Sequence, residues 1–159
     1  MVSFFVTCVG IRGICRNFAI QMSELAKTIL TRYWGYPNFR PFQEDIVDSV
    51  MAGKDTLALL PTGGGKSICF QVPTMAMDGL CLVITPLVAL MKDQVANLAK
   101  KGIPAAAIYS GKHSDEIQLA YNQAVYGRLK FLYVSPERLQ TDTFIEALKR
   151  MKVCLLAVD

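Results

Sequence analysis

The sequence predicts an α/β fold in which a mainly parallel sheet is covered by helices on both faces. Short apolar runs alternate with helical patterns along the chain, which is typical of β-α-β units. These runs are unbroken, as in strands that are buried on both faces. A glycine-rich segment joins one of them to a helical pattern. Together the three observations predict a three-layer α/β domain.

The strands are predicted where apolar runs are too short for helices, and the helices where apolar residues recur at helical spacing. The predicted strands are 56–60, 80–85, 105–109, 130–135 and 153–158. The predicted helices are 23–34, a segment around 42–50, one after the glycine-rich segment, 86–98, 117–126 and a last one near 143. Pro86 suits a first helical turn, and Ser114 is expected to cap the fifth helix. Thr143 with Glu146 matches a capping box for the last helix.

Composition favours one folded domain. The chain has 159 residues, of which 52% are hydrophobic and 19% charged, enough for one packed core. The net charge is +4, but 15 basic against 13 acidic residues remain without Arg12 and Arg16, so charge alone does not predict nucleic-acid binding. The five cysteines lack metal-ligand spacing, which predicts a reducing, cytoplasmic environment and no structural zinc. No apolar run reaches the ~18 residues that span a membrane.

The first 21 residues are predicted to be a non-native extension. Residues 1–15 are apolar but lack a basic beginning, and Arg12 interrupts the run, so they do not match a signal peptide. Met22 directly precedes Ser23, where helical patterning begins, and is the expected true start. A genuine short extension is the alternative. We therefore expect an extension at 1–21, followed at 22–159 by the N-terminal part of one truncated domain.

The segment LPTGGGKS, residues 60–67, predicts a phosphate-binding loop. Its glycines let successive backbone N–H groups converge on an anion, and the N-terminus of the following helix adds partial positive charge. Lys66 is expected to reach the terminal phosphates of a nucleotide, and the Ser67 hydroxyl to bind Mg²⁺. Leu60 departs from the strict pattern, so a plain glycine-rich turn is the alternative. The expected loop contacts are Thr62, Gly63, Gly64, Gly65, Lys66 and Ser67.

Four further segments, in order along the chain, resemble motifs of the RecQ-type helicases of superfamily 2. WGYPNFRPFQ at 34–43 resembles the family's adenine motif, and TPLVALMKDQV at 85–95 resembles its motif Ia. YVSPERL at 133–139 resembles motif Ib, and LLAVD at 155–159 resembles the start of the DExH box. The resemblance implies a RecA-like P-loop NTPase domain, ATP and Mg²⁺ as cofactors, and DNA as the partner. It also implies 3′-to-5′ unwinding of DNA in repair and recombination.

In the adenine motif, the resemblance implies that Gln43, Tyr36 and Arg40 recognise the base. An amide both donates and accepts hydrogen bonds, which matches the N6 and N7 edge of adenine. Tyr36 is expected to stack on the base and Arg40 to assist. Phe39 and Phe42 are expected to be core aromatics, which is also the alternative for Tyr36.

Motifs Ia and Ib follow predicted strands, and ligands of open α/β sheets gather beyond the carboxyl ends of strands. Short hydroxyl, amide and cationic groups suit a phosphate backbone, so a nucleic-acid track is expected there. The alternative to nucleic-acid contact is that Lys92 is an ordinary solvated lysine on a helix and that Glu137 is an ordinary helix cap. The expected contacts are Thr85, Pro86, Lys92, Ser135, Pro136 and Arg138.

Asp159 ends an apolar run, and its carboxylate is expected beside Mg²⁺ together with Ser67. Lys66 and Asp159 are therefore the expected catalytic residues. The family's box continues with Glu-Ala-His, which these 159 residues do not contain. We accordingly expect the chain alone to be inactive. A non-catalytic nucleotide-binding remnant and a superfamily 2 RNA helicase fragment are the alternatives.

Overall fold

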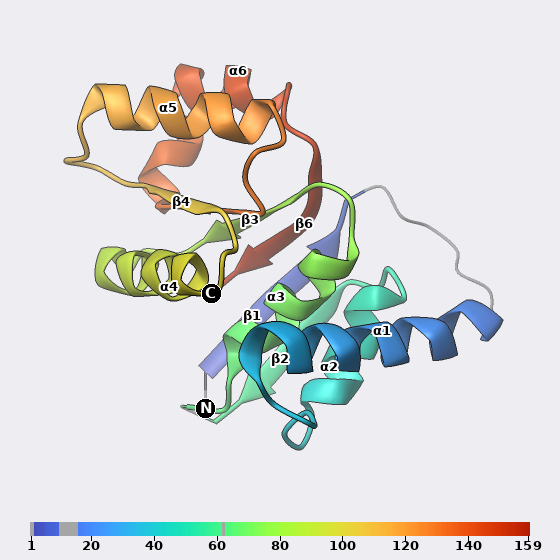
Figure 1. The fold of residues 1–159 in the computed structure, drawn as a ribbon. Helices are drawn as coiled ribbons and strands as arrows, with labels where there is room; N and C mark the ends of the chain where they lie inside the picture. Colours follow the sequence, from blue (N-terminus) through green and yellow to red (C-terminus); the bar gives the residue numbers. More distant parts are fainter. Residues whose placement is uncertain (1, 10–15, 62) are drawn as a thin grey trace. The chain divides into compact units, whose positions relative to one another are not determined.

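The computed structural model describes residues 2–9, 16–61 and 63–159, in which helices and strands alternate (Figure 1). The predicted α/β fold class is confirmed. The chain divides into two compact units, with Gly79–Val153 forming unit 2 and the segments before and after it forming unit 1. In the described residues, no helix is both long and apolar enough to cross a membrane.

Unit 1 contains strands β1 (Val2–Cys8) and β2 (Thr56–Leu60), strand β6 (Val153–Val158) from its second residue onward, and helices α1 (Arg16–Trp34), α2 (Gln43–Met51) and α3 (Lys66–Ala76). Strand β1 is antiparallel to both β2 and β6. Strands β2 and β6 therefore run in the same direction, and their carboxyl ends lie at the same edge of the sheet. That edge carries the glycine-rich loop after β2 and Asp159 after β6.

The helices of unit 1 lie on one side of its strands (Figure 1). They share a buried core made of Ala26, Ile29, Leu30, Val47, Met51, Ile68 and Val72. Alternate residues of β2 are buried, whereas Leu57 and Leu59 between them are 68% and 61% exposed. Phe5 lies directly across from both Leu57 and Val158, and is likewise exposed, as is Val158. These four residues form an open apolar face of the unit 1 strands.

Unit 2 contains strands β3 (Leu80–Ile84), β4 (Ala105–Ile108) and β5 (Phe131–Val134), all parallel, in the order β3-β5-β4. Helix α4 (Val88–Lys100) lies on one side of these strands, and α5 (Ser114–Val125) and α6 (Asp142–Leu148) lie on the other (Figure 1). A short 3₁₀ helix, η1 (Pro136–Gln140), follows β5. All four residues of β5 are buried, as expected for a central parallel strand between two helical layers.

The predicted strands agree closely with the structure. Strands β2 and β6 have the predicted bounds, β3 and β4 are one residue shorter at one end, and β5 is one residue shorter at each end. Strand β1 was not predicted from the sequence, and α1 begins at Arg16 instead of Ser23. The proposed start at Met22 stays a prediction, but residues 2–8 form a strand in the chain as it stands.

Several predicted helix ends are wrong. Helix α4 begins after Leu87 at the N-cap position, so Pro86 precedes the helix. Helix α5 has His113 at its N-cap position, without a capping hydrogen bond from the side chain, and Ser114 is its first residue. Helix α6 begins at Asp142, so Thr143 lies inside it and forms no capping box.

The prediction for Phe42 as a core aromatic is also wrong. Its side chain is 69% exposed and its φ is +69°, at the N-cap of α2. The prediction for Phe39 agrees with the structure, because Phe39 packs against the unit 1 core.

Candidate nucleotide site and nucleic-acid residues

The predicted phosphate loop joins the end of β2 to the start of α3, which begins at Lys66. Gly63 and Gly65 have φ angles of +78° and +75°, values that residues with a side chain rarely adopt. Gly64 has a different constraint, because a Cβ on it would lie 2.8 Å from the Pro61 carbonyl oxygen. All three positions therefore favour glycine for backbone reasons. Thr62 lies outside the described residues.

The adenine-motif residues contact the loop directly. Gln43 is 3% exposed, and its Nε2 donates hydrogen bonds to the carbonyl oxygens of Gly64 and Gly65, both at 3.1 Å. Its Oε1 accepts the Arg40 backbone N–H at 2.9 Å, and Arg40 Nη1 donates to the Gly63 carbonyl oxygen at 2.9 Å. The side chains of Gln43 and Arg40 thus hold the backbone of the three loop glycines in place. This structural role was not predicted from the sequence.

A cavity of about 360 Å³ opens beside this contact. Its lining combines aromatic side chains with loop glycines, which suits a flat base with an attached phosphate chain. Tyr36 is half exposed, as expected for a ring that stacks on a ligand. Trp34 and Ile68 also line the cavity, and only the position of Trp34 at the start of the motif could have indicated this. The lining residues are Trp34, Tyr36, Pro37, Asn38, Arg40, Gln43, Gly63, Gly65 and Ile68.

Lys66 and Asp159 form an ion pair between Nζ and Oδ1, although 93 positions separate them in the sequence. Their side chains are only 19% and 16% exposed. Ser67 follows Lys66 in the first turn of α3. A carboxylate and a hydroxyl are hard oxygen ligands of the kind that Mg²⁺ prefers, so Ser67 and Asp159 could hold this ion. The structure therefore brings together the charged groups that the sequence analysis assigned to phosphates and metal.

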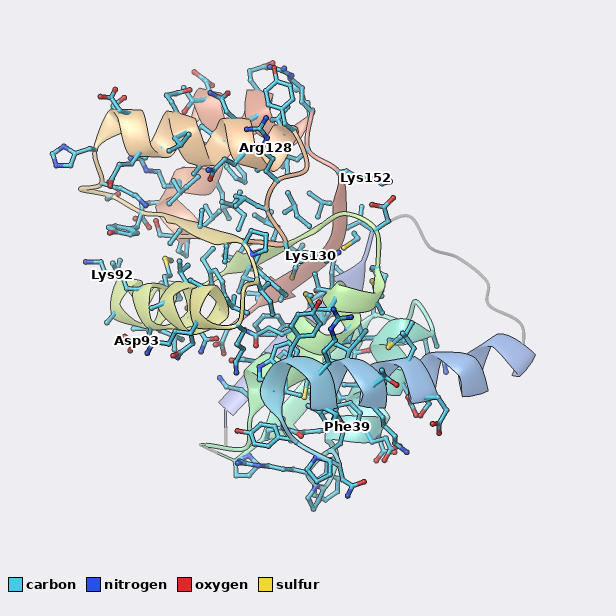
Figure 2. All side chains as sticks on the ribbon, in the orientation of Figure 1. Phe39, Lys92, Asp93, Arg128, Lys130 and Lys152 are labelled. Atoms are coloured by element: carbon cyan, nitrogen blue, oxygen red, sulfur yellow. The ribbon has the colours of Figure 1, made fainter. Side chains whose placement is uncertain are left out.

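The residues predicted to contact nucleic acid belong to unit 2 and differ in how far they are exposed to solvent. Thr85 and Ser135 follow the adjacent parallel strands β3 and β5, but both are buried, at 2% and 1% exposure. Pro86 and Pro136 are exposed. The Nε atom of Arg138 is buried without a hydrogen-bond partner. Lys92 projects from α4 with its Nζ 5.3 Å from the centre of the Tyr109 ring (Figure 2).

Glu137 links the ends of two strands in unit 2. Its Oε1 accepts hydrogen bonds from the Ser135 hydroxyl at 2.5 Å and from the Ser110 hydroxyl at 3.0 Å. Hydrogen bonds stabilise the charged form, so the Ser135 hydroxyl first, then the Glu137 backbone N–H and the Ser110 hydroxyl, lower the pKa of Glu137 to about 2. From the sequence, Glu137 was expected at most to cap a helix. The structure makes it the acceptor that orients Ser135.

The low pKa of Glu137 leads to a prediction. Because the pKa of Glu137 is lower in the folded protein, its ionised carboxylate stabilises the fold at pH values above the ordinary pKa of 4.5. This contribution to stability is lost as the pH falls toward about 2. We expect Ser135→Ala to raise the pKa of Glu137 more than Ser110→Ala does, because the Ser135 hydrogen bond has the larger effect. An NMR titration of the Glu137 carboxyl carbon in the three proteins measures this. A larger rise in Ser110→Ala would contradict the assigned cause.

Comparisons with known proteins agree with these motifs. A family model described as DEAD/DEAH box helicase matches residues 40–159. The chain belongs to this family. ATP-dependent DNA helicase RecQ of Haemophilus influenzae is 42% identical over 134 residues, which are 84% of this chain and 22% of that protein. ATP-dependent DNA helicase RecQ of Bacillus subtilis is 42% identical over 139 residues, 87% of this chain and 24% of that protein.

A eukaryotic relative is more distant. ATP-dependent helicase wrn-1 of Caenorhabditis elegans is 37% identical over 136 residues, which are 84% of this chain and 13% of that protein. The chain thus spans between about an eighth and a quarter of these three helicases. The predicted resemblance to RecQ-type helicases is confirmed, and the matched region includes the phosphate loop and Asp159.

Proposed function

We propose that this chain forms the first part of the ATP-binding domain of a RecQ-type DNA helicase. The whole protein would couple ATP hydrolysis to 3′-to-5′ unwinding of DNA, in repair and recombination in the cytoplasm. The observation that carries the proposal is the cavity beside the phosphate loop, next to a helix whose first residue pairs with Asp159. Relatives named ATP-dependent DNA helicase support the choice of DNA.

The base of ATP is proposed to enter the cavity that Trp34 and Tyr36 line. Stacking on an aromatic ring accounts for affinity, and the buried Gln43 amide accounts for selectivity. Both hydrogen-bonding ends of this amide are occupied by the loop and by the Arg40 backbone when no base is bound. A bound base would therefore either replace the hydrogen bonds of Gln43 to the loop and to Arg40 or form additional hydrogen bonds beside them.

The phosphates are proposed to lie over the loop and the N-terminus of α3. Backbone N–H groups and the helix dipole favour an anion there. Lys66 would turn from Asp159 to the terminal phosphates, and Asp159 and Ser67 would then hold Mg²⁺. Bound Mg²⁺ would supply positive charge that neutralises the phosphate oxygens during transfer.

The nucleic-acid track is proposed to follow the carboxyl ends of β3 and β5. Thr85 and Ser135 are buried, so their neighbours Pro86 and Pro136 and the exposed Lys92 would approach DNA first. The Ser135 hydroxyl donates to Glu137 and is not free to donate to a phosphate. Backbone contacts of this kind carry no sequence information, which suits an enzyme that moves along DNA.

Equilibrium binding tests the proposal. The chain is expected to bind ATP more tightly in the presence of Mg²⁺ than in EDTA, and more tightly than it binds GTP. Failure to bind Mg-ATP even at about 1 mM, the upper end of common substrate affinities, would contradict the proposed function.

Gln43→Ala is expected to weaken Mg-ATP binding by about five- to tenfold, because a lost buried hydrogen bond costs about 1 kcal/mol or more. Binding of inorganic triphosphate should fall less, since only the contacts to Gly64 and Gly65 matter for this ligand. Competition against a fluorescent ATP analogue measures both affinities.

Gln118→Ala is the matched control, because Gln118 is exposed on α5 in unit 2. It should change neither affinity. Equal losses for ATP and triphosphate in Gln43→Ala would show that Gln43 holds the loop without recognising the base.

A further inference from the structure

Two serine hydroxyls meet one carboxylate where strands β4 and β5 end. The strands are parallel and paired up to Ile108↔Val134, and the Ser135 backbone N–H donates to the Ile108 carbonyl oxygen at 3.0 Å. This register brings Ser110 and Ser135 to the same edge of unit 2. Both hydroxyls donate to Oε1 of Glu137, Ser135 at 2.5 Å and Ser110 at 3.0 Å. The two donors therefore converge on a single anionic oxygen.

The Glu137 carboxylate thus occupies a set of donors that suits an oxygen anion. The backbone N–H groups of Glu137 and Ser110 also donate to it and help to lower its pKa. Hydroxyls and backbone N–H groups are common donors to the phosphates of nucleic acids. Glu137 is exposed whereas Ser135 is 1% exposed, so the carboxylate lies between the Ser135 hydroxyl and solvent. A phosphate would reach this hydroxyl only after the carboxylate has moved.

Two lysines lie next to these donors. Tyr109 directly precedes Ser110, and the Nζ atoms of Lys92 and Lys112 are 5.3 and 5.7 Å from the centre of its ring. Within the part of the chain that the structure describes, neither ammonium forms an ion pair with a carboxylate. The lysines would attract a phosphate that approaches this edge, whereas the carboxylate of Glu137 would repel it.

We propose that Glu137 is an internal competitor of the nucleic-acid backbone at this edge of unit 2. In the free protein its carboxylate holds the two serine hydroxyls, and a phosphate of the backbone takes its place when nucleic acid binds. The inference rests on the proposed nucleic-acid track, which it extends to the end of β4. A single free phosphate would gain only the serine contacts, whereas a chain of phosphates would also reach Lys92 and Lys112. Glu137 would therefore favour nucleic acid over small anions.

Binding of a fluorescent single-stranded oligothymidylate to the 159-residue chain tests the proposal. Glu137→Ala removes the charge and frees both hydroxyls, so we expect it to bind the oligonucleotide about fivefold more tightly. Glu137→Gln removes the charge but keeps an acceptor for the serines, so its gain should be smaller. Fluorescence anisotropy measures the affinities, and both gains should shrink at high salt because charge repulsion is screened. The melting temperature reports whether each variant folds.

Glu116→Gln is the matched control, because Glu116 is an exposed carboxylate on α5 of unit 2 and its replacement changes the net charge equally. It should bind the oligonucleotide as the unchanged chain does. Weaker binding by folded Glu137→Ala would overturn the proposal, since Glu137 would then orient the serines for nucleic acid. If Glu137→Ala does not fold, Glu137→Gln decides, and a gain no larger than that of Glu116→Gln would overturn the proposal.

A second arm introduces Ser110→Ala into the unchanged chain and into Glu137→Ala. In the unchanged chain Glu137 holds the Ser110 hydroxyl, so its removal should alter the affinity by less than about twofold. In Glu137→Ala it should cancel part of the gain, because a phosphate loses a donor. Equal effects in both backgrounds would overturn the proposal. If none of these proteins binds the oligonucleotide, the proposed track itself fails, whereas binding that Glu137→Ala leaves unchanged overturns the competitor alone.

Discussion

Lys66→Ala is expected to abolish ATP turnover in a full-length helicase that carries this chain, with a loss of about 100-fold or more. The ammonium is the cation that the structure places at the start of α3, and it would neutralise charge on the terminal phosphates. DNA binding should be largely retained, because the proposed track uses residues of unit 2. A steady-state ATPase assay and an equilibrium DNA-binding assay measure the two effects.

Lys100→Ala is the matched control, since Lys100 is an exposed lysine near the end of α4. It should turn over ATP at the rate of the unchanged protein. Removing Lys66 also leaves Asp159 without its ion-pair partner, so the melting temperature of Lys66→Ala should fall in EDTA and recover in Mg²⁺. Turnover by Lys66→Ala that matches the control would refute the assignment of this lysine.

A protein that consists of residues 1–159 is expected to bind Mg-ATP weakly and to show no DNA-stimulated turnover. Lys66, Ser67 and Asp159 would hold phosphates and metal, but the glutamate that the family resemblance implies for activating water is not among these residues. Hydrolysis relies on an oriented water as well as on neutralised charge. The ATPase rate with and without single-stranded DNA tests this expectation, and a DNA-stimulated rate typical of an enzyme would contradict it.

The same protein is expected to aggregate through its open apolar face. Phe5, Leu57, Leu59 and Val158 present neighbouring apolar side chains on one side of three strands, and such a patch promotes association. Leu57→Lys should delay aggregation on heating. Leu119→Lys is the control, because Leu119 is 57% exposed on helix α5 of unit 2 and is not one of the four residues of that face. Light scattering during a thermal ramp distinguishes the two, and equal delays would contradict a specific role for the face.

Local patterns in the sequence were enough to predict the strands and the phosphate loop. Strands β2 and β6 are unbroken apolar runs, and the loop needs glycines at positions that its backbone alone dictates. The sequence predicted Lys66 as a phosphate contact and Asp159 as a metal contact, and it did not predict an ion pair between them. Their direct contact depends on the sheet bringing distant residues to the same edge.

Features that depend on tertiary packing could not be predicted in this way. Residues 2–8 are apolar, and nothing local distinguishes a central strand from an unrelated extension, so β1 was missed. Gln43 was assigned to adenine by motif position, whereas its contacts to the loop carbonyls require α2 and the loop to be adjacent. The helix caps were misplaced by one or two residues, because several residue types near each end can occupy the cap.

The ion pair between Lys66 and Asp159 makes each of these residues the counter-ion of the other in the free protein. In the proposed site, phosphates that attract the ammonium would release the carboxylate for Mg²⁺, and Mg²⁺ that attracts the carboxylate would release the ammonium for phosphates. Each ligand would therefore lower the free-energy cost of binding the other, and thermodynamic linkage requires the two effects to be equal. The site would discriminate against free phosphate and free Mg²⁺ alike and respond to the two together.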